Sequence, residues 1–406
     1  MHRINIRKKS TLCSIVLASL FVVNFTSAQE AERDSLRQAY TDSVLVQATR
    51  LPTPASRLPY ALSQLDEADL QAGQSQQSLA EPLYQLPGLL VLNPYNFAQD
   101  LRLSVRGFGA RAAFGIRGLS ITLDGFPEST PDGQGQVDNL EAGFLGGVEL
   151  LRGPSSALYG NASGGVLRFR SAPIPAQPEA EARFITGSFG YRRVQLRTAG
   201  RSGAWGWSAY GGHTVADGYR EHSLNRSTLV NARLERTLKN GGRLAVYFNG
   251  VNSPVAEDPG SLTDSLAQAD PQAAWPRNLA FDARESVQQG RIGLRWEQPV
   301  GERGELETSV FLLGRDFENR LPFGPGGAVQ LQRTFTGGRA VYRWRGSLWE
   351  KPLRTVVGTQ LGWQSDERQR YDNESGALGG LAFNQTERFT AIGLFLLQEW
   401  ALHPQF

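Results

Sequence analysis

Cysteine is almost absent from this sequence of 406 residues, since Cys13 is the only one. Cys13 lies in the apolar stretch Thr11–Phe25, which follows the basic segment His2–Ser10 and precedes small residues at 26–28. This order of segments predicts a signal peptide over residues 1–28 that is removed on export. The exported chain would then have no disulfide, no thiolate nucleophile and no cysteine ligand for a metal ion.

The sequence also has little excess charge of either sign. Its 42 basic and 39 acidic residues give a net charge of +3. Residues 1–28 contain four basic residues and no acidic one, so their removal leaves a net charge of −1. A chain with this balance has no general basic excess with which to bind phosphates, and we predict no nucleic-acid partner.

Long apolar segments are missing after Phe25, and the stretch Thr11–Phe25 is itself shorter than the ~20 residues of a membrane-spanning helix. If the exported protein enters a membrane, it must therefore do so as β-strands. The 45 glycines, with 20 Phe, 11 Tyr and 8 Trp, favour a β-rich protein with many turns.

Motifs for catalysis are lacking as well. There is no G-x-S-x-G and no H-E-x-x-H, and the histidines after the signal peptide are His213, His222 and His403, the first two in an expected loop. The segment Gly107–Ala112 fits G-x-G-x-x-A, but two more glycines follow where a dinucleotide-binding helix would have to continue. We predict a protein that is not an enzyme and that has no cofactor and no metal site.

In residues 51–172 short apolar runs alternate with Gly, Pro and Asp. This residue pattern predicts a small mixed α+β domain. Ser78 and Glu81 form a capping-box pattern, and leucines at 79, 83 and 86 follow at helical spacing until Pro87, which predicts a helix. Short strands are predicted in five places: Leu89–Leu92, Leu101–Arg106, Leu119–Leu123, Gly147–Arg152 and Val166–Arg170.

Beyond residue 180 the pattern changes to period two, as the alternation of polar and apolar residues over 193–198 illustrates. Ten such segments follow one another, the last at Phe389–Trp400. Their connections alternate between tight ones, such as Lys239–Gly242, and long ones, such as Ser253–Glu285. This combination predicts antiparallel strands of a transmembrane β-barrel. A soluble all-β sandwich with the same alternation is the alternative.

An ordered set of motifs over residues 42–172 resembles that of the TonB-dependent outer-membrane receptors. The run Asp42-Ser43-Val44-Leu45-Val46-Gln47-Ala48 is similar to the TonB box of that family. Leu86–Gly88 resembles its LPG motif, Val105–Gly109 its IRG strand, and Leu123–Pro127 its turn of Asp-Gly, an aromatic or aliphatic residue and Pro. The longest match is Val148–Gly160. Each motif alone is weak evidence for the resemblance, but the ordered set is specific. The later strands resemble the family only in their general residue pattern.

The resemblance implies a plug domain inside a 22-stranded barrel in the outer membrane of a Gram-negative bacterium, in contact with its lipid. Such a receptor binds a scarce, large nutrient from outside, and TonB with its inner-membrane energising complex pulls on the plug. The segment Asp42–Ala48 would be the TonB contact, because an extended segment can add a strand to the edge of a partner's sheet. The alternative is that Val44–Val46 is the first strand of the plug.

Two plug loops, at 93–99 and 110–118, should face outward under this resemblance, and residues 131–136 are a third candidate. We expect them to carry the ligand-binding residues, with aromatic rings for apolar contact and guanidinium groups for anionic oxygens: Tyr95, Phe97, Arg111, Phe114 and Arg117. Ordinary packing within the loops is the alternative for each residue. The cationic groups favour a ferric siderophore or another iron chelate. Arg106 and Arg152, at strand ends, are expected to pair with carboxylates of the barrel.

We therefore expect a signal peptide at 1–28, a segment with the TonB box at 29–50, a plug at 51–172 and the N-terminal part of a barrel at 180–406. Ten strands are fewer than half of those that the resemblance implies, so we expect an incomplete barrel. The alternative functions are a passive porin-like channel and an adhesin. A passive channel would need neither a domain ahead of its strands nor a TonB box.

Overall fold

The computed structural model describes residues 45–46, 50, 53–54, 60–112 and 114–402. The expected signal peptide lies outside the described residues, as do five residues of the expected TonB box: Asp42, Ser43, Val44, Gln47 and Ala48. The other two form strand β1 (Leu45–Val46), which belongs to a two-stranded sheet with β2 (Thr53–Pro54).

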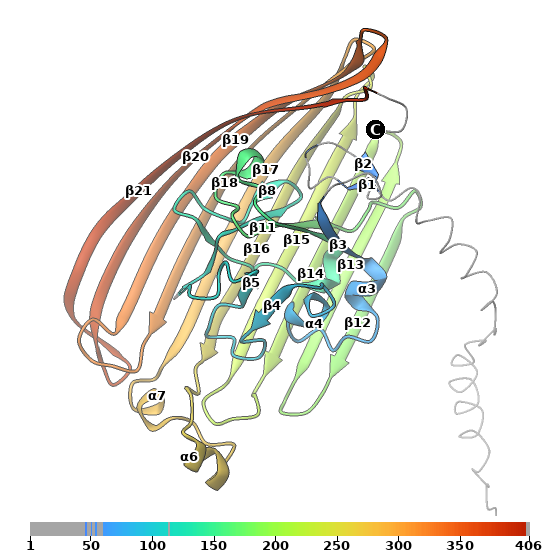
Figure 1. Ribbon diagram of the computed structural model, residues 1–406. Coiled ribbons are helices and arrows are strands. Elements are labelled where there is room, and N and C mark those ends of the chain that lie inside the picture. The colour runs from blue at the N-terminus through green and yellow to red at the C-terminus, as the bar shows by residue number, and fades with distance from the viewer. Residues whose placement is uncertain (1–44, 47–49, 51–52, 55–59, 113, 403–406) are drawn as a thin grey trace, which may run out of the picture. The chain divides into compact units, whose positions relative to one another are not determined.

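The first folded part, here called the plug, is built around a five-stranded sheet (Figure 1). The order is β3-β10-β11-β7-β8, and all neighbours are antiparallel except β11 and β7. The apolar side chains of Ile121, Leu150 and Phe169 are fully buried in its core. The strands are β3 (Ala61–Asp66), β10 (Leu145–Arg152), β11 (Gly165–Ser171), β7 (Leu119–Leu123) and β8 (Phe126–Pro127).

Shorter elements complete the plug. Helix α3 begins with a capping box, in which the side chains of Asp66 and Asp69 each accept a hydrogen bond from the other's backbone N–H. Strand β4 pairs with β5, and β6 pairs with β9. The bounds are α3 (Glu67–Gln71), α4 (Ala80–Leu83), β4 (Leu89–Leu92), β5 (Arg102–Val105), β6 (Ile116–Arg117), β9 (Gln134–Gly135), the 3₁₀ helix η2 (Ala142–Phe144) and α5 (Ser156–Tyr159).

The five predicted plug strands are confirmed to within two residues at each end, but the predicted helix is shorter than expected. Ser78 and Glu81 do satisfy the first N–H groups, since Ser78 Oγ accepts from the N–H of Ala80 and the Glu81 carboxylate accepts from that of Ser78. The helix nevertheless spans only Ala80–Leu83. After Leu83 the N–H groups of residues 85 and 86 bond to carbonyls three residues back, which is the 3₁₀ pattern, so the α-helix does not continue to Leu86.

The second part is a ten-stranded sheet, here called the wall, in which each strand pairs antiparallel with the next along the chain (Figure 1). The number of strands and their alternation agree with the prediction. The bounds are β12 (Glu179–Thr186), β13 (Arg192–Ser202), β14 (Trp205–Ala216), β15 (Asn225–Thr237), β16 (Arg243–Glu257), β17 (Arg284–Val300), β18 (Gly304–Arg320), β19 (Ala328–Leu348), β20 (Lys351–Glu374) and β21 (Ala377–Trp400).

Connections at the two ends of the wall differ in length. One end has only short turns, at 203–204, 238–242, 301–303 and 349–350. The other end carries the longest connection, 258–283, which contains α6 (Asp264–Ala269) and α7 (Pro276–Ala280). The prediction that His213 lies in a loop is wrong, because strand β14 continues to Ala216 and includes it.

The two faces of the wall are opposite in polarity to those of a soluble sheet. Val194 and Leu196 are 45% and 58% exposed, whereas the intervening face carries Arg193 and Gln195 at 3% and 4%. The same inversion continues to β21, where Leu394 is 80% exposed. An apolar outer face with a polar inner face is the pattern of a membrane barrel. No helix in the described part of the chain is long and apolar enough to cross a membrane.

The plug packs against the polar inner face of the wall through an aromatic side chain as well as through charges. The ring of Phe126 lies over Gly293 of β17, where an added Cβ would come within 2.6 Å of it. Tyr247 and Phe311 contact the same ring edge-on, with centroids 5.2 and 6.2 Å away. A glycine in the wall thus makes room for the aromatic residue of the plug's Asp-Gly-Phe-Pro turn.

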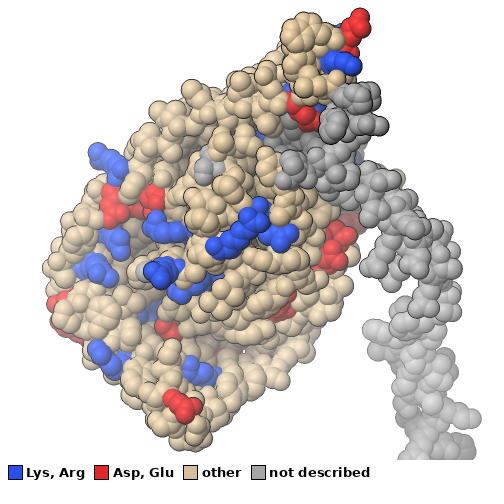
Figure 2. Space-filling model, in the orientation of Figure 1, with Lys and Arg blue, Asp and Glu red and all other residues tan. Residues whose placement is uncertain are grey.

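The expected pairing of plug arginines with wall carboxylates is wrong. Arg152 donates to the carbonyl of Pro87 and to Ser63, both in the plug, and Arg106 is exposed. The ion pairs between plug and wall have the opposite polarity, with the carboxylate on the plug and the guanidinium on the wall. Figure 2 shows basic and acidic side chains dispersed on the visible face, without a large area of one sign.

Candidate ligand-binding site

A cavity of about 380 Å³, here called the arginine cavity, lies between plug loops and the inner face of the wall. Its plug side includes Phe114 and Arg117, from the second predicted loop, and its wall side includes residues of β17 to β21. Five arginines line it: Arg117, Arg315, Arg333, Arg368 and Arg370. The volume falls within the ~300–1,000 Å³ of sites that hold whole small molecules.

Most of these arginines are already paired. Arg315 contacts Asp138 at 2.6 Å and Arg333 contacts Asp366 at 2.6 Å, while Arg117 and Arg368 have looser pairs with Asp132 and Glu387, both at 3.7 Å. Arg370 has no side-chain partner within the described ranges, and its Nε is buried without a hydrogen bond. The lining also carries five carboxylates, so the cavity has no overall excess of positive charge: Asp100, Asp132, Glu285, Asp366 and Glu387. Arg370 is the lining arginine that has no side-chain partner among the described residues, and Arg117 and Arg368 have the weakest pairs.

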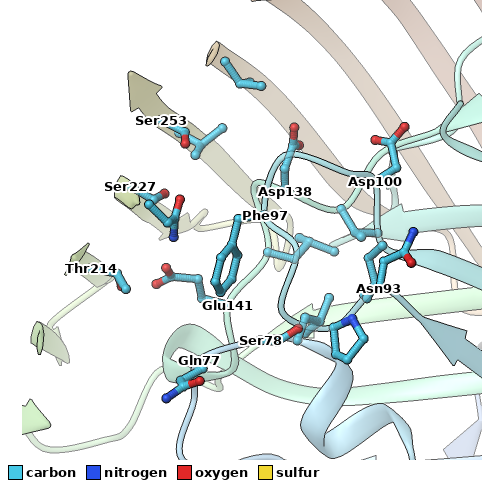
Figure 3. Close-up of a pocket in the computed structure, with 18 of the residues that line it drawn as sticks. Gln77, Ser78, Asn93, Phe97, Asp100, Asp138, Glu141, Thr214, Ser227 and Ser253 are labelled. Carbon is cyan, nitrogen blue, oxygen red and sulfur yellow. The ribbon is translucent and has the colours of Figure 1, made fainter. Parts of the chain in front are cut away.

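A second, smaller cavity of about 160 Å³, here called the amide cavity, adjoins the first and shares Gln99, Asp100, Gln136 and Glu285 with it. Figure 3 shows Phe97 near its centre, between wall residues such as Thr214 and Ser227 and plug residues such as Asn93. Seven of its lining side chains are amides and four are hydroxyls. Its lining is thus mainly uncharged and hydrogen-bonding.

Asp100 lies where the two cavities meet. Its carboxylate accepts a hydrogen bond from the N–H of Gly115 at 2.5 Å, and burial raises its pKa above the usual value while this bond opposes the rise.

The five predicted ligand residues separate into three groups. Phe114 and Arg117 line the arginine cavity, and Phe97 lines the amide cavity. Tyr95 is 58% exposed, and neither Tyr95 nor Arg111 lines either cavity. The structure therefore brings three of the five to the cavities and leaves two outside them.

The sequence reasoning missed Arg370, which lines the arginine cavity, and Asp258, which lines neither cavity but bonds to two residues of the amide cavity. Asp258, at the start of the 258–283 connection, accepts hydrogen bonds from the amides of Asn96 and Gln99 at 3.0 and 2.9 Å. It thus fixes the first plug loop to the long connections of the wall. Arg370 could have been noticed from the alternation of Asp366, Arg368 and Arg370, which places all three on one face of a strand.

Arg50, just after the expected TonB box, is held against both plug and wall. Its guanidinium lies 4.1 Å from the ring centroid of Tyr159 and 4.4 Å from that of Phe395, and it donates to the carbonyl of Leu158 at 2.7 Å. Burial lowers the pKa of Arg50 to about 10. A group anchored in this way fixes the point at which the N-terminal segment joins the folded plug.

Comparison with known proteins identifies the first part of the chain. Residues 54–166 match the model of the TonB-dependent Receptor Plug Domain. The chain is 29% identical over 217 residues to the vitamin B12 transporter BtuB of Photobacterium profundum, a match that covers 52% of this chain and 33% of that protein. It is 26% identical to the hemin receptor of Yersinia pestis over 94% of this chain and 60% of that protein.

Solved structures share the fold of both parts. The unliganded ferric citrate transporter FecA superposes with a TM-score of 0.71 at 17% identity, over 88% of this chain and 57% of that one. The siderophore receptor PiuA of Acinetobacter baumannii gives a TM-score of 0.67 at 12% identity, over 90% and 58%. The chain thus spans roughly a third to three fifths of the length of these proteins.

Proposed function

Because this chain belongs to the family of TonB-dependent receptors, we propose that it takes up a scarce nutrient across the outer membrane of a Gram-negative bacterium in an energy-coupled way. The arginine cavity would bind the nutrient from outside. The observation that carries this proposal is that plug loop and wall converge on one cavity. There Arg370, which has no side-chain partner among the described residues, shares the lining with the ring of Phe114 and the guanidinium of Arg117.

The ligand that suits the arginine cavity is a metal chelate with anionic oxygens, such as a ferric siderophore or ferric citrate. Guanidinium groups bind carboxylate and catecholate oxygens through charge-assisted hydrogen bonds. The names of the similar proteins include such ligands beside others: a ferric citrate transporter, a siderophore receptor, a vitamin B12 transporter and a hemin receptor. The phenylalanines at 114, 317 and 389 supply apolar contact for the organic part of such a chelate.

The proposal assigns a role to each part of the chain. Residues 1–28 would direct export, and residues 29–50 would present Asp42–Ala48 to TonB. The plug, residues 51–172, would close the barrel and carry the inner side of the ligand site. Residues 180–406 would cross the outer membrane, with the apolar faces of β12 to β21 against its lipid.

Binding of ferric citrate and of a ferric tris-catecholate, measured by quenching of intrinsic fluorescence, tests the site. Arg370→Gln should weaken binding of any chelate that the wild type binds by about tenfold, because one charge-assisted contact is lost. The matched control is Arg345→Gln, an exposed arginine of β19 that lines neither cavity. Equal affinity in Arg370→Gln and Arg345→Gln would contradict the proposed site.

A further inference from the structure

The amide cavity differs in chemistry from the arginine cavity that it adjoins. Its one cation, Arg193, is 3% exposed and is occupied by an ion pair with Glu141 at 2.6 Å and a hydrogen bond to the carbonyl of Gln76 at 2.6 Å. Asp138 is paired with Arg315 at 2.6 Å. The other two carboxylates of the lining, Asp100 and Glu285, form no ion pair within the described part of the chain, and they accept hydrogen bonds from the N–H of Gly115 and the amide of Asn319. The cavity therefore repels an anionic group.

Several of its polar side chains have no hydrogen-bond partner in the described part of the chain. Thr214 is 4% exposed, and its Oγ1 is buried without a hydrogen bond. The side chains of Asn93 and Ser227 form no hydrogen bond with any other described residue, and Figure 3 shows them on opposite sides of Phe97. A buried hydroxyl without a partner destabilises the protein, and a ligand group that bonds to this hydroxyl removes that cost.

The size of the cavity restricts what it can hold. At about 160 Å³ it lies below the ~300–1,000 Å³ of a site for a whole small molecule, whereas the adjoining arginine cavity lies within that range. Since the two share the residues around Asp100, one ligand could extend from the larger cavity into the smaller one.

We infer that the nutrient is bipartite: an anionic chelating body in the arginine cavity, and an uncharged arm rich in hydroxyl or amide groups in the amide cavity. This inference rests on the uptake function proposed above. Thr214 and Ser227 on the wall and Asn93 on the plug bond to the arm, and the ring of Phe97 packs against its carbon skeleton. Selectivity among anionic chelates then comes from the arm, because the arginines bind any anionic body.

Two ferric tris-catecholates of equal charge test the inference, one bare and one with a glucosyl group on one ring. Wild-type protein should bind the glucosylated complex about fivefold tighter or more, the effect of one net hydrogen bond. Thr214→Val and Ser227→Ala, singly and together, should abolish this preference and leave the affinity for the bare complex unchanged. Arg370→Gln should weaken both complexes in the same proportion.

Thr308→Val is the matched control, because Thr308 alternates with the buried Glu307 and Ser309 and so lies on the outer face of the wall. It should retain the preference. The inference of a bipartite ligand is wrong if the wild type binds both complexes equally, or if the preference persists in the Thr214→Val/Ser227→Ala protein. The proposed uptake function is unaffected by either result. If neither complex binds, the proposal that the nutrient is an anionic chelate is wrong, and so is the inference of a bipartite ligand.

Discussion

The carboxylate of Glu128 in the plug and the guanidinium of Arg291 in β17 form an ion pair in which the side chains are only 2% and 3% exposed. Burial raises the pKa of Glu128, and the nearby charge of Arg291 opposes that rise. The other pairs between plug and wall in the described part of the chain have the same polarity: Glu67 with Arg197, Asp138 with Arg315, and Glu141 with Arg193. An acidic plug surface thus faces a basic wall.

Removing one member of the buried pair should destabilise the protein strongly. Arg291→Met leaves the Glu128 carboxylate buried without its cation, which typically costs about 3–5 kcal/mol. The double variant Glu128→Leu/Arg291→Met should cost much less, because no unpaired charge remains. Thermal unfolding of the purified protein, followed by circular dichroism, measures both effects.

Arg117→Met serves as the control for that comparison, since the Arg117 side chain is 48% exposed and its pair with Asp132 is loose. It should change the stability by about 1 kcal/mol or less. If the double variant loses as much stability as the sum of Glu128→Leu and Arg291→Met, the two residues do not act as a pair.

The fit of Phe126 over Gly293 predicts an unusually costly glycine substitution. In Gly293→Ala the new methyl group would lie about 2.6 Å from the Phe126 ring, so the plug must shift. Overpacking of this kind costs about 1–3 kcal/mol. Gly290→Ala on the same strand is the matched control, because no atom of a described residue lies within 4 Å of its added Cβ.

Phe126→Ala should suppress the effect of Gly293→Ala, because the ring that the methyl group meets is then absent. The melting temperatures of the two single variants and the double variant form a thermodynamic cycle. Additive losses of stability would show that Phe126 and Gly293 do not contact each other in the folded protein.

Arg111 and Arg117 provide a test of the loop residues expected from the sequence. Changing both to Ala should weaken binding of an anionic chelate by about tenfold or more. Because Arg117 lines the arginine cavity and Arg111 does not, the loss should come almost entirely from Arg117→Ala. Fluorescence quenching with each single variant measures this, and an unchanged affinity in the double variant would remove both residues from the site.

Local patterns predicted the elements of this fold well, because each strand depends on neighbours in sequence. Strands Leu89–Leu92 and Leu119–Leu123 have the predicted bounds. Strand β3 and helix α3 were missed, since Ala61–Gln71 has neither clear alternation nor an apolar helical face. In α4 the start was recognised, but the helix ends at Leu83, because the following N–H groups bond three residues back instead of four.

The site was less predictable, because it depends on contacts between distant segments. The bond between Asn96 and Asp258 joins residues 162 positions apart, and no local pattern indicates such a contact. The polarity of the plug's ion pairs was likewise predicted in the wrong direction, from Arg106 and Arg152 at strand ends. The position of an arginine at a strand end does not show which residues lie opposite its side chain after folding.

Energy-coupled uptake is the central claim, and one substitution separates uptake from binding. Val44→Pro removes a backbone donor from the segment that resembles a TonB box, so it should prevent strand addition by TonB. Gln38→Pro, in the polar segment before it, is the matched control. With a radiolabelled ferric chelate that the receptor binds, cells carrying Val44→Pro should bind the chelate as the wild type does but accumulate none, while Gln38→Pro cells accumulate it normally. Accumulation at the wild-type rate in Val44→Pro cells would contradict the account.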